Sequence, residues 1–101
     1  MAQMKIFWTA TAIKQRNQVF EYWNDRNKSA RYSGRLLSEI NERINLLHTH
    51  PKLGRETDFK NTRVLSMGYY NIFYKTLDHR IIITAFWDTR QDPEKLVYLL
   101  K

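Results

Sequence analysis

The first half of the chain combines one strand-like run with two segments of helical periodicity. Lys5–Trp8 is a short bulky run that suits a pleated strand. Thr9 follows with a hydroxyl that can cap a helix. Apolar positions then recur at three- and four-residue steps, which predicts one buried helix face. These positions are Ala12, Ile13, Arg16 (through its aliphatic stem), Val19, Phe20 and Trp23. The polar stretch 24–28 predicts a turn.

A second helix is expected from Ser29, whose side chain can cap it, to the residues before Pro51. Its apolar stripe is formed by Ser33, Leu36, Leu37, Ile40, Ile44 and Leu47. Charged side chains such as Glu39 and Arg43 fall on the opposite face. Two helices joined by a short polar turn form an antiparallel hairpin.

The second half of the chain is typical of strands. Residues 51–61 are mostly polar and predict a loop, and three strands are expected after it, at 62–67, 69–76 and 80–87. The middle strand has one face made of Tyr70, Ile72 and Tyr74. The last strand is apolar on both faces around residues 81–83, which is typical of an interior strand.

This order predicts an α+β fold in one domain that spans residues 1–101. An N-terminal strand and an antiparallel helix hairpin accompany a mainly antiparallel sheet of about four strands, and the hairpin packs on one face. A short C-terminal helix is expected near Pro93, with Leu96, Leu99 and Leu100. We find neither a secretory signal nor an apolar run near the roughly 20 residues of a membrane helix. The expected location is cytoplasmic, away from membranes.

Charge narrows the choice of partners. Lys and Arg number 17 against 10 Asp and Glu, a net charge of +7 that favours anionic partners. Two basic stretches stand out, at residues 26–35 and 52–63, although a solvated charged face explains either stretch alone equally well. The residues expected to bind a partner are Arg26, Lys28, Arg31, Arg35, Lys52 and Arg55.

The chain offers little for metal or cofactor chemistry. It has no cysteine, which excludes disulfides and thiolate ligands. His48, His50 and His79 lack the spacing of a zinc pair, and three scattered glycines cannot form a phosphate-binding loop. We therefore expect no metal and no cofactor.

The sheet ends carry cations and aromatic rings that suit a phosphate or a base. Arg63, Arg90 and Lys60 can bind phosphate or stabilise charge on a phosphoryl group. Exposed rings can stack on unpaired bases. The rings considered for this are Tyr69, Tyr70, Phe73, Tyr74 and Trp87. For the alternating trio of residues 70, 72 and 74, core packing is the favoured interpretation.

The order strand, helix, helix, three-strand meander resembles the RelE/ParE superfamily, the toxin halves of type II toxin–antitoxin modules. The resemblance runs from about Lys5 to Pro93. It is carried by Ala12-Ile13, by Ile40, Ile44 and Leu47, by Pro51-Lys52-Leu53-Gly54, by Arg63-Val64-Leu65 and by Tyr70-Asn71-Ile72-Phe73-Tyr74. It implies a growth-inhibiting, plasmid-stabilising toxin that a cognate antitoxin neutralises with an acidic disordered tail, in a hetero-oligomer.

Two targets are compatible with this resemblance, since RelE-type members cleave mRNA on the ribosome and ParE-type members poison DNA gyrase. An endoribonuclease would use Arg63, Arg90 and Lys60 for electrostatic stabilisation, with Tyr98 or His79 for proton transfer. Trp87 stands where the family commonly has a histidine, which slightly favours the gyrase poison without catalysis. A non-toxic, basic nucleic-acid-binding module is the third alternative.

Overall fold

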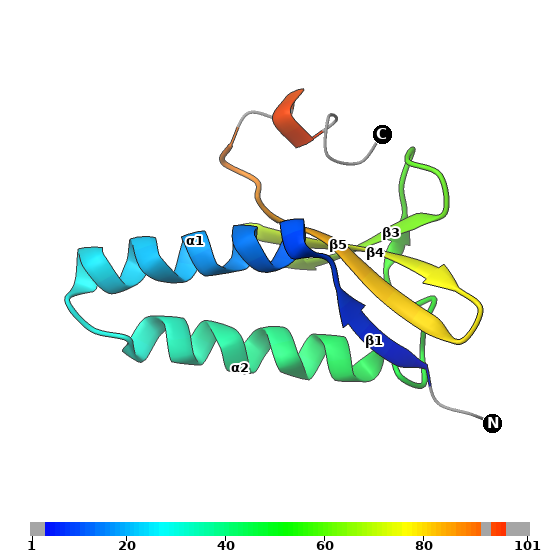
Figure 1. The fold of residues 1–101 in the computed structure, drawn as a ribbon, viewed down its shortest axis with the longest axis horizontal. Helices are drawn as coiled ribbons and strands as arrows, with labels where there is room; N and C mark the ends of the chain where they lie inside the picture. The colour runs from blue at the N-terminus through cyan, green and yellow to red at the C-terminus, as the bar shows by residue number, and fades with distance from the viewer. Residues whose placement is uncertain (1–3, 92–93, 97–101) are drawn as a thin grey trace.

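Two helices cover one face of a single sheet in the computed structural model, which describes residues 4–91 and 94–96 (Figure 1). The elements are β1 Lys5–Trp8, α1 Ala10–Asn27, α2 Arg31–Leu46, β2 Arg55–Glu56, β3 Thr62–Met67, β4 Tyr70–Leu77 and β5 Arg80–Asp88. Residues 94–96 form a short helical turn, whereas Leu99 and Leu100 of the expected C-terminal helix lie outside the described residues. Within the described residues, no helix combines the length and apolar character needed to span a bilayer.

The sheet has the strand order β1-β5-β4-β3-β2. β1 runs parallel to β5, and all other neighbours are antiparallel. The predicted mainly antiparallel sheet is therefore confirmed, with five strands where about four were expected. Its fifth strand, β2, lies within residues 51–61, which were predicted to form a loop. The sequence did not indicate this strand because two residues are too few to show an alternation of apolar and polar positions. Arg55 and Glu56 pair there with Val64 and Arg63.

The main core lies between the sheet and the helix hairpin. Tyr70, Ile72 and Tyr74 are buried on the helix side of β4, so the predicted core face is confirmed. β5 lies between β1 and β4, as its apolar centre predicted. The largest fully buried side chains are Tyr74, Phe86, Ile40, Leu47, Ile72, Ile81 and Ile83.

A β-bulge near the middle of β5 changes which side chains face the helices. Phe73 pairs with Ala85 but Tyr74 pairs with Ile83, so Thr84 is an extra residue in β5. Beyond it, Phe86 faces the helices, although strict alternation from Ile83 would turn it away. The backbone N–H of Phe86 donates to Gln15 Oε1 of α1 at 2.9 Å. The bulge thereby also attaches α1 to the sheet.

The opposite face of the sheet has a smaller core of its own. It consists of Val64, Phe73, Ala85 and Trp87, with Phe59 and Leu96 packed against it. Of the five rings considered for base stacking, Phe73 and Trp87 are buried here, and Tyr70 and Tyr74 are buried on the helix side. Tyr69 alone among the five is exposed. The bulge could not be read from the sequence, and it places Trp87 in this second core.

α1 begins as predicted but runs further. Thr9 is its N-cap, and the Thr9 hydroxyl accepts a hydrogen bond from the Ala12 N–H. The helix continues to Asn27, so the predicted turn at 24–28 is wrong for most of its length. α1 ends because Lys28 adopts a left-handed conformation, with φ of 52°, and its N–H donates to the Asn24 carbonyl.

α2 is shorter than predicted at both ends. It starts at Arg31 with Ala30 as N-cap, and the hydroxyl of Ser29, the expected cap, accepts from the Arg31 N–H one position before the observed N-cap. The last turn ends at Leu46, before Pro51 is reached. Leu47 is nevertheless fully buried, as the apolar stripe predicted.

α1 is poorly covered, which the sequence pattern did not indicate. Ala12 is its one buried residue, and Ile13 is 37% exposed. Val19, Phe20 and Trp23 are half-buried at the margin of the main core. The connected ends of the two helices extend past the sheet, so the sheet leaves the last turn of α1 uncovered (Figure 1).

Candidate functional site

An open groove of about 520 Å³ separates α1 from the start of β4 and the end of β5. Its apolar and aromatic lining consists of Val19, Tyr22, Trp23, Tyr70, Phe86 and Trp87. Its polar lining consists of Gln15, Gln18, Asp88, Arg90, Gln91 and Lys95. Such a mixture of apolar surface and a few polar groups is typical of binding sites. We call it the α1 groove.

Trp23 and Tyr70 connect the two sides of the α1 groove. Trp23 Nε1 donates to Tyr70 Oη at 2.9 Å. The Trp23 ring also makes edge contacts with Tyr22 and Tyr32, each with 5.0 Å between ring centres. Tyr70 stacks on Phe86 at 5.2 Å. These contacts hold the groove's aromatic rings in fixed positions, which lowers the entropy lost when a partner binds.

Arg90, one of the predicted catalytic cations, lies at the rim of the α1 groove. Its Nε and Nη2 donate to the two carboxylate oxygens of Asp88 at 2.9 and 2.8 Å. Its guanidinium also lies 4.7 Å from the centre of the Tyr69 ring. The hydrogen bonds from Arg90 lower the pKa of Asp88, and the same pair raises the pKa of Arg90. Both groups are charged at neutral pH, and Asp88 balances much of the Arg90 charge.

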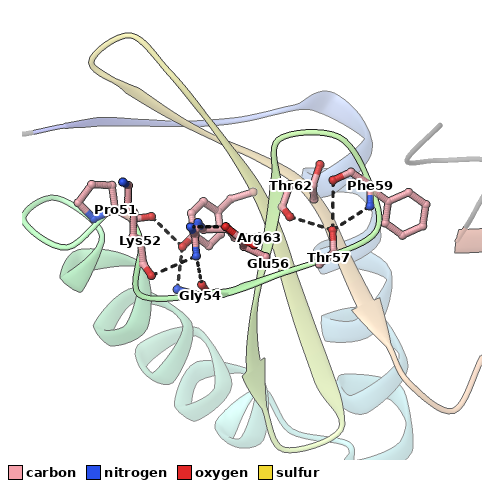
Figure 2. Close-up of polar contacts among 9 residues, drawn as sticks. Pro51, Lys52, Gly54, Glu56, Thr57, Phe59, Thr62 and Arg63 are labelled. Atoms are coloured by element: carbon pink, nitrogen blue, oxygen red, sulfur yellow. Dashed lines mark hydrogen bonds and ion pairs between the residues drawn. The ribbon is translucent and has the colours of Figure 1, made fainter.

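Arg63, the second predicted catalytic cation, holds the loop between α2 and β3 (Figure 2). Its Nη1 donates to the Gly54 carbonyl at 2.8 Å and to the Lys52 carbonyl at 3.4 Å. Its Nη2 forms an ion pair with Glu56 at 3.2 Å. Arg63 therefore binds backbone carbonyls of its own chain, which is a structural role.

The hydroxyl of Tyr74 attaches the same loop to the middle of the sheet. It accepts from the Gly54 N–H and donates to the Pro51 carbonyl, both at 2.8 Å. Nearby, the Thr57 hydroxyl donates to the Thr62 carbonyl at 2.8 Å and accepts from the Phe59 N–H (Figure 2). These bonds give a loop of mostly polar residues a defined shape.

We expect the protein to lose stability as the pH rises above about 10, because burial raises the pKa of both Tyr70 and Tyr74. The two phenols keep their protons in the folded state where the unfolded chain has already lost them. Their contribution is complete below about pH 10 and is lost as the pH rises through the folded-state pKa values. Urea unfolding from about pH 9 to about pH 11 should show this decline.

The Tyr70→Phe variant should show a smaller decline than the wild type over the same pH range, because it lacks one of the two phenols. Tyr69→Phe, at an exposed ring of the same turn, should follow the wild-type curve. Equal slopes for the wild type and Tyr70→Phe would contradict the prediction.

The sheet keeps the predicted catalytic residues apart. Arg63 pairs with Tyr74 on β4, whereas Asp88, which binds Arg90, pairs with Tyr70. Four residues along β4 and two strand spacings separate Arg63 from Asp88, or roughly 17 Å. The arginines are therefore not brought to one phosphate.

Of the other residues assigned to catalysis, Lys60 lies near Arg63 and none of those described lies near Arg90. Lys60 is exposed and lines, together with Lys52 and Arg63, a hollow of about 460 Å³ that is distinct from the α1 groove at Arg90. His79 lies exposed in the turn between β4 and β5. Tyr98 lies outside the described residues. Across residues 4–91 and 94–96, no three His, Asp or Glu side chains are grouped to hold a metal ion.

The residues predicted to bind a partner fall into two places. Arg26, Lys28, Arg31 and Arg35 surround the connection between α1 and α2, and all four are exposed. Lys52 and Arg55 lie about the loop before β3, near the other end of α2. Sequence reasoning missed the α1 groove, because Trp23 and Tyr70 meet across 47 positions of the chain. The one feature of the sequence that could have indicated this groove is Trp23, a large aromatic residue on the apolar face of a predicted helix next to polar residues.

The architecture of one strand, a helix hairpin and a meander is shared with a solved toxin–antitoxin protein. The similar structure is described as the chromosomal ParDE TA system from P. aeruginosa, with a TM-score of 0.72 and 15% sequence identity. The match covers 83% of this chain and 94% of that one. At this identity the likeness shows the fold.

A family model gives the more specific result. Residues 6–93 match the model of the ParE toxin of the type II toxin–antitoxin system parDE, and the chain therefore belongs to this family. The resemblance to the RelE/ParE superfamily is thereby confirmed. A search of curated proteins returned no matching sequence.

Proposed function

We propose that this ParE-family toxin inhibits growth by poisoning DNA gyrase without catalysing a reaction itself, and that a cognate antitoxin holds it inactive. Placement of the two arginines is the observation that supports a non-catalytic mechanism. Arg63 binds loop carbonyls and Glu56, and Arg90 binds Asp88, at places roughly 17 Å apart along the sheet. The cleavage of mRNA outlined for an endoribonuclease would require Arg63 and Arg90 to converge on one phosphate.

The α1 groove is the proposed seat of the antitoxin. α1 has one buried residue among 18, and its half-buried Val19 and Trp23 lie in the groove. A partner segment with apolar side chains can complete this core, as helix-in-groove recognition requires. The chain's net charge of +7, with Lys95 at the groove rim, suits the acidic tail that such a segment would carry.

Purified gyrase provides the direct test of the target. The chain, added to gyrase and relaxed plasmid, should inhibit supercoiling, and its expression in cells should induce DNA damage signalling. Normal supercoiling at saturating concentrations of the chain would overturn the gyrase assignment. Adding the purified cognate antitoxin should restore supercoiling.

The endoribonuclease alternative has a readout of its own. It requires translation-dependent cuts in mRNA that the Arg90→Ala variant abolishes while keeping its fold. We expect intact transcripts from both the wild type and this variant. Arg90 is the better position for this test than Arg63, since loss of Arg63 also removes the hydrogen bonds to Gly54 and Lys52.

A further inference from the structure

The tip of the helix hairpin carries a concentrated positive charge. We define the hairpin tip as Arg26, Lys28, Arg31 and Arg35, which lie within two turns of the connection between α1 and α2. Residues 22–38 contain these four cations and a single carboxylate, Asp25, for a net charge of +3. Figure 1 shows this connection projecting beyond the sheet, on the side away from β1.

The cations of the hairpin tip are not neutralised within the chain. All four residues are exposed, and none takes part in the three ion pairs found among the described residues. Two of the candidate cations elsewhere are paired, Arg63 with Glu56 and Arg90 with Asp88. The hairpin tip therefore retains its charge for an external anion.

A network of aromatic and polar contacts supports the hairpin tip. Arg26 lies 5.9 Å from the Trp23 ring centre and donates to the Tyr22 hydroxyl at 3.3 Å. Between the helices, the Ser33 hydroxyl donates to Asn24 Oδ1 at 2.6 Å, and the Tyr32 ring contacts Trp23. These contacts hold Arg26 and fix the two helices that carry the tip cations relative to each other, which reduces the ordering cost of binding.

We propose that the hairpin tip binds the phosphate backbone of duplex DNA. Protein interfaces depend on buried aromatic or aliphatic anchors, and within residues 22–38 the exposed large hydrophobic residues are Tyr22 and Leu37 alone. Phosphates are bound through charge alone, without sequence readout. The choice of DNA rests on the proposed function, in which the target enzyme is itself bound to DNA.

Salt-dependent binding to a duplex of about 20 base pairs, followed by fluorescence anisotropy, tests this proposal. Four phosphate contacts predict a slope of log affinity against log salt of about −3 to −4. The Arg31→Glu/Arg35→Glu variant should reduce the steepness by about 2 and weaken binding at least tenfold near 0.1 M salt. Glu at position 31 suits the first turn of α2, so the fold should persist, as thermal unfolding will check.

The matched control is Lys5→Glu/Lys14→Glu, which changes the net charge equally at exposed positions away from the hairpin tip. It should keep the wild-type slope. Equal weakening by both double variants would overturn the proposal in favour of diffuse charge, and so would tighter binding to single-stranded RNA. Unchanged DNA binding with impaired antitoxin binding would assign the tip to the acidic protein instead. Because the assay contains no gyrase, its result is independent of the gyrase test.

Discussion

Replacing Gly54 by Ala is expected to destabilise the protein by about 2–4 kcal/mol. A Cβ atom at this position would lie 2.8 Å from Tyr74 Cε1, from Tyr74 Oη and from the Val64 carbonyl oxygen. The Tyr74 ring is fully buried and Val64 belongs to β3, so neither can move aside cheaply. The added methyl group would separate the loop from the sheet and break the hydrogen bond from the Gly54 N–H to Tyr74.

The measurement is urea or thermal unfolding of the purified variant. For a domain of this size the loss should lower the melting temperature by roughly 10–20 °C. Gly34→Ala provides the control, because a Cβ atom at exposed Gly34 in α2 meets nothing within 4 Å. That variant should gain about 0.5–1 kcal/mol, since Ala favours helices more than Gly does. Equal stability of both variants would contradict the close approach at Gly54.

Changing Val19 to Glu is expected to weaken binding of the cognate antitoxin at least about thirtyfold, the effect of losing one interface hot spot. Val19 is half-buried on α1 and lines the α1 groove, as Phe86 of β5 does. A carboxylate there would lose water when the partner covers it and would repel an acidic tail. Titration calorimetry with the purified antitoxin measures the change.

Asn17→Glu is the matched control for this variant. It adds the same charge to the same helix, at an exposed position that does not line the groove. Antitoxin affinity should change less than about threefold, because rim and remote charges contribute little. If Asn17→Glu and Val19→Glu weaken binding equally, the antitoxin does not occupy the α1 groove.

Local patterns were sufficient for most elements. The hydroxyl of Thr9 and the alternation of residues 70, 72 and 74 predicted the start of α1 and the core face of β4, because both signals lie within a few residues. The interior position of β5 followed from its apolar centre. Local signals failed where pairing with another segment determines whether a strand forms. This is the case for β2, which pairs with β3 at Val64 and is too short to show a pattern in its own sequence.

The candidate site was harder to predict because its residues are chosen by long-range packing. Arg63 was expected to face a phosphate, but the loop carbonyl groups of Lys52 and Gly54 recruit it. The sequence pattern predicted that Arg63 lies in a strand, but it did not predict the conformation of the loop that Arg63 binds. Likewise, the bulge at Thr84 determines on which face of the sheet Phe86 and Trp87 lie, and no residue in β5 indicates that a bulge forms there.

The parallel pairing of β1 with β5 has a consequence for how the toxin is made. Ile6 aligns with Ile81, so β1 has no partner until the residues of β5 have left the ribosome. Until then the partner strand that β1 has in the folded protein is missing. Contacts between residues so far apart in the sequence form late, and proteins that depend on such contacts fold slowly. A chain that stops before residue 80 therefore lacks β5, the strand that joins β1 to the rest of the sheet.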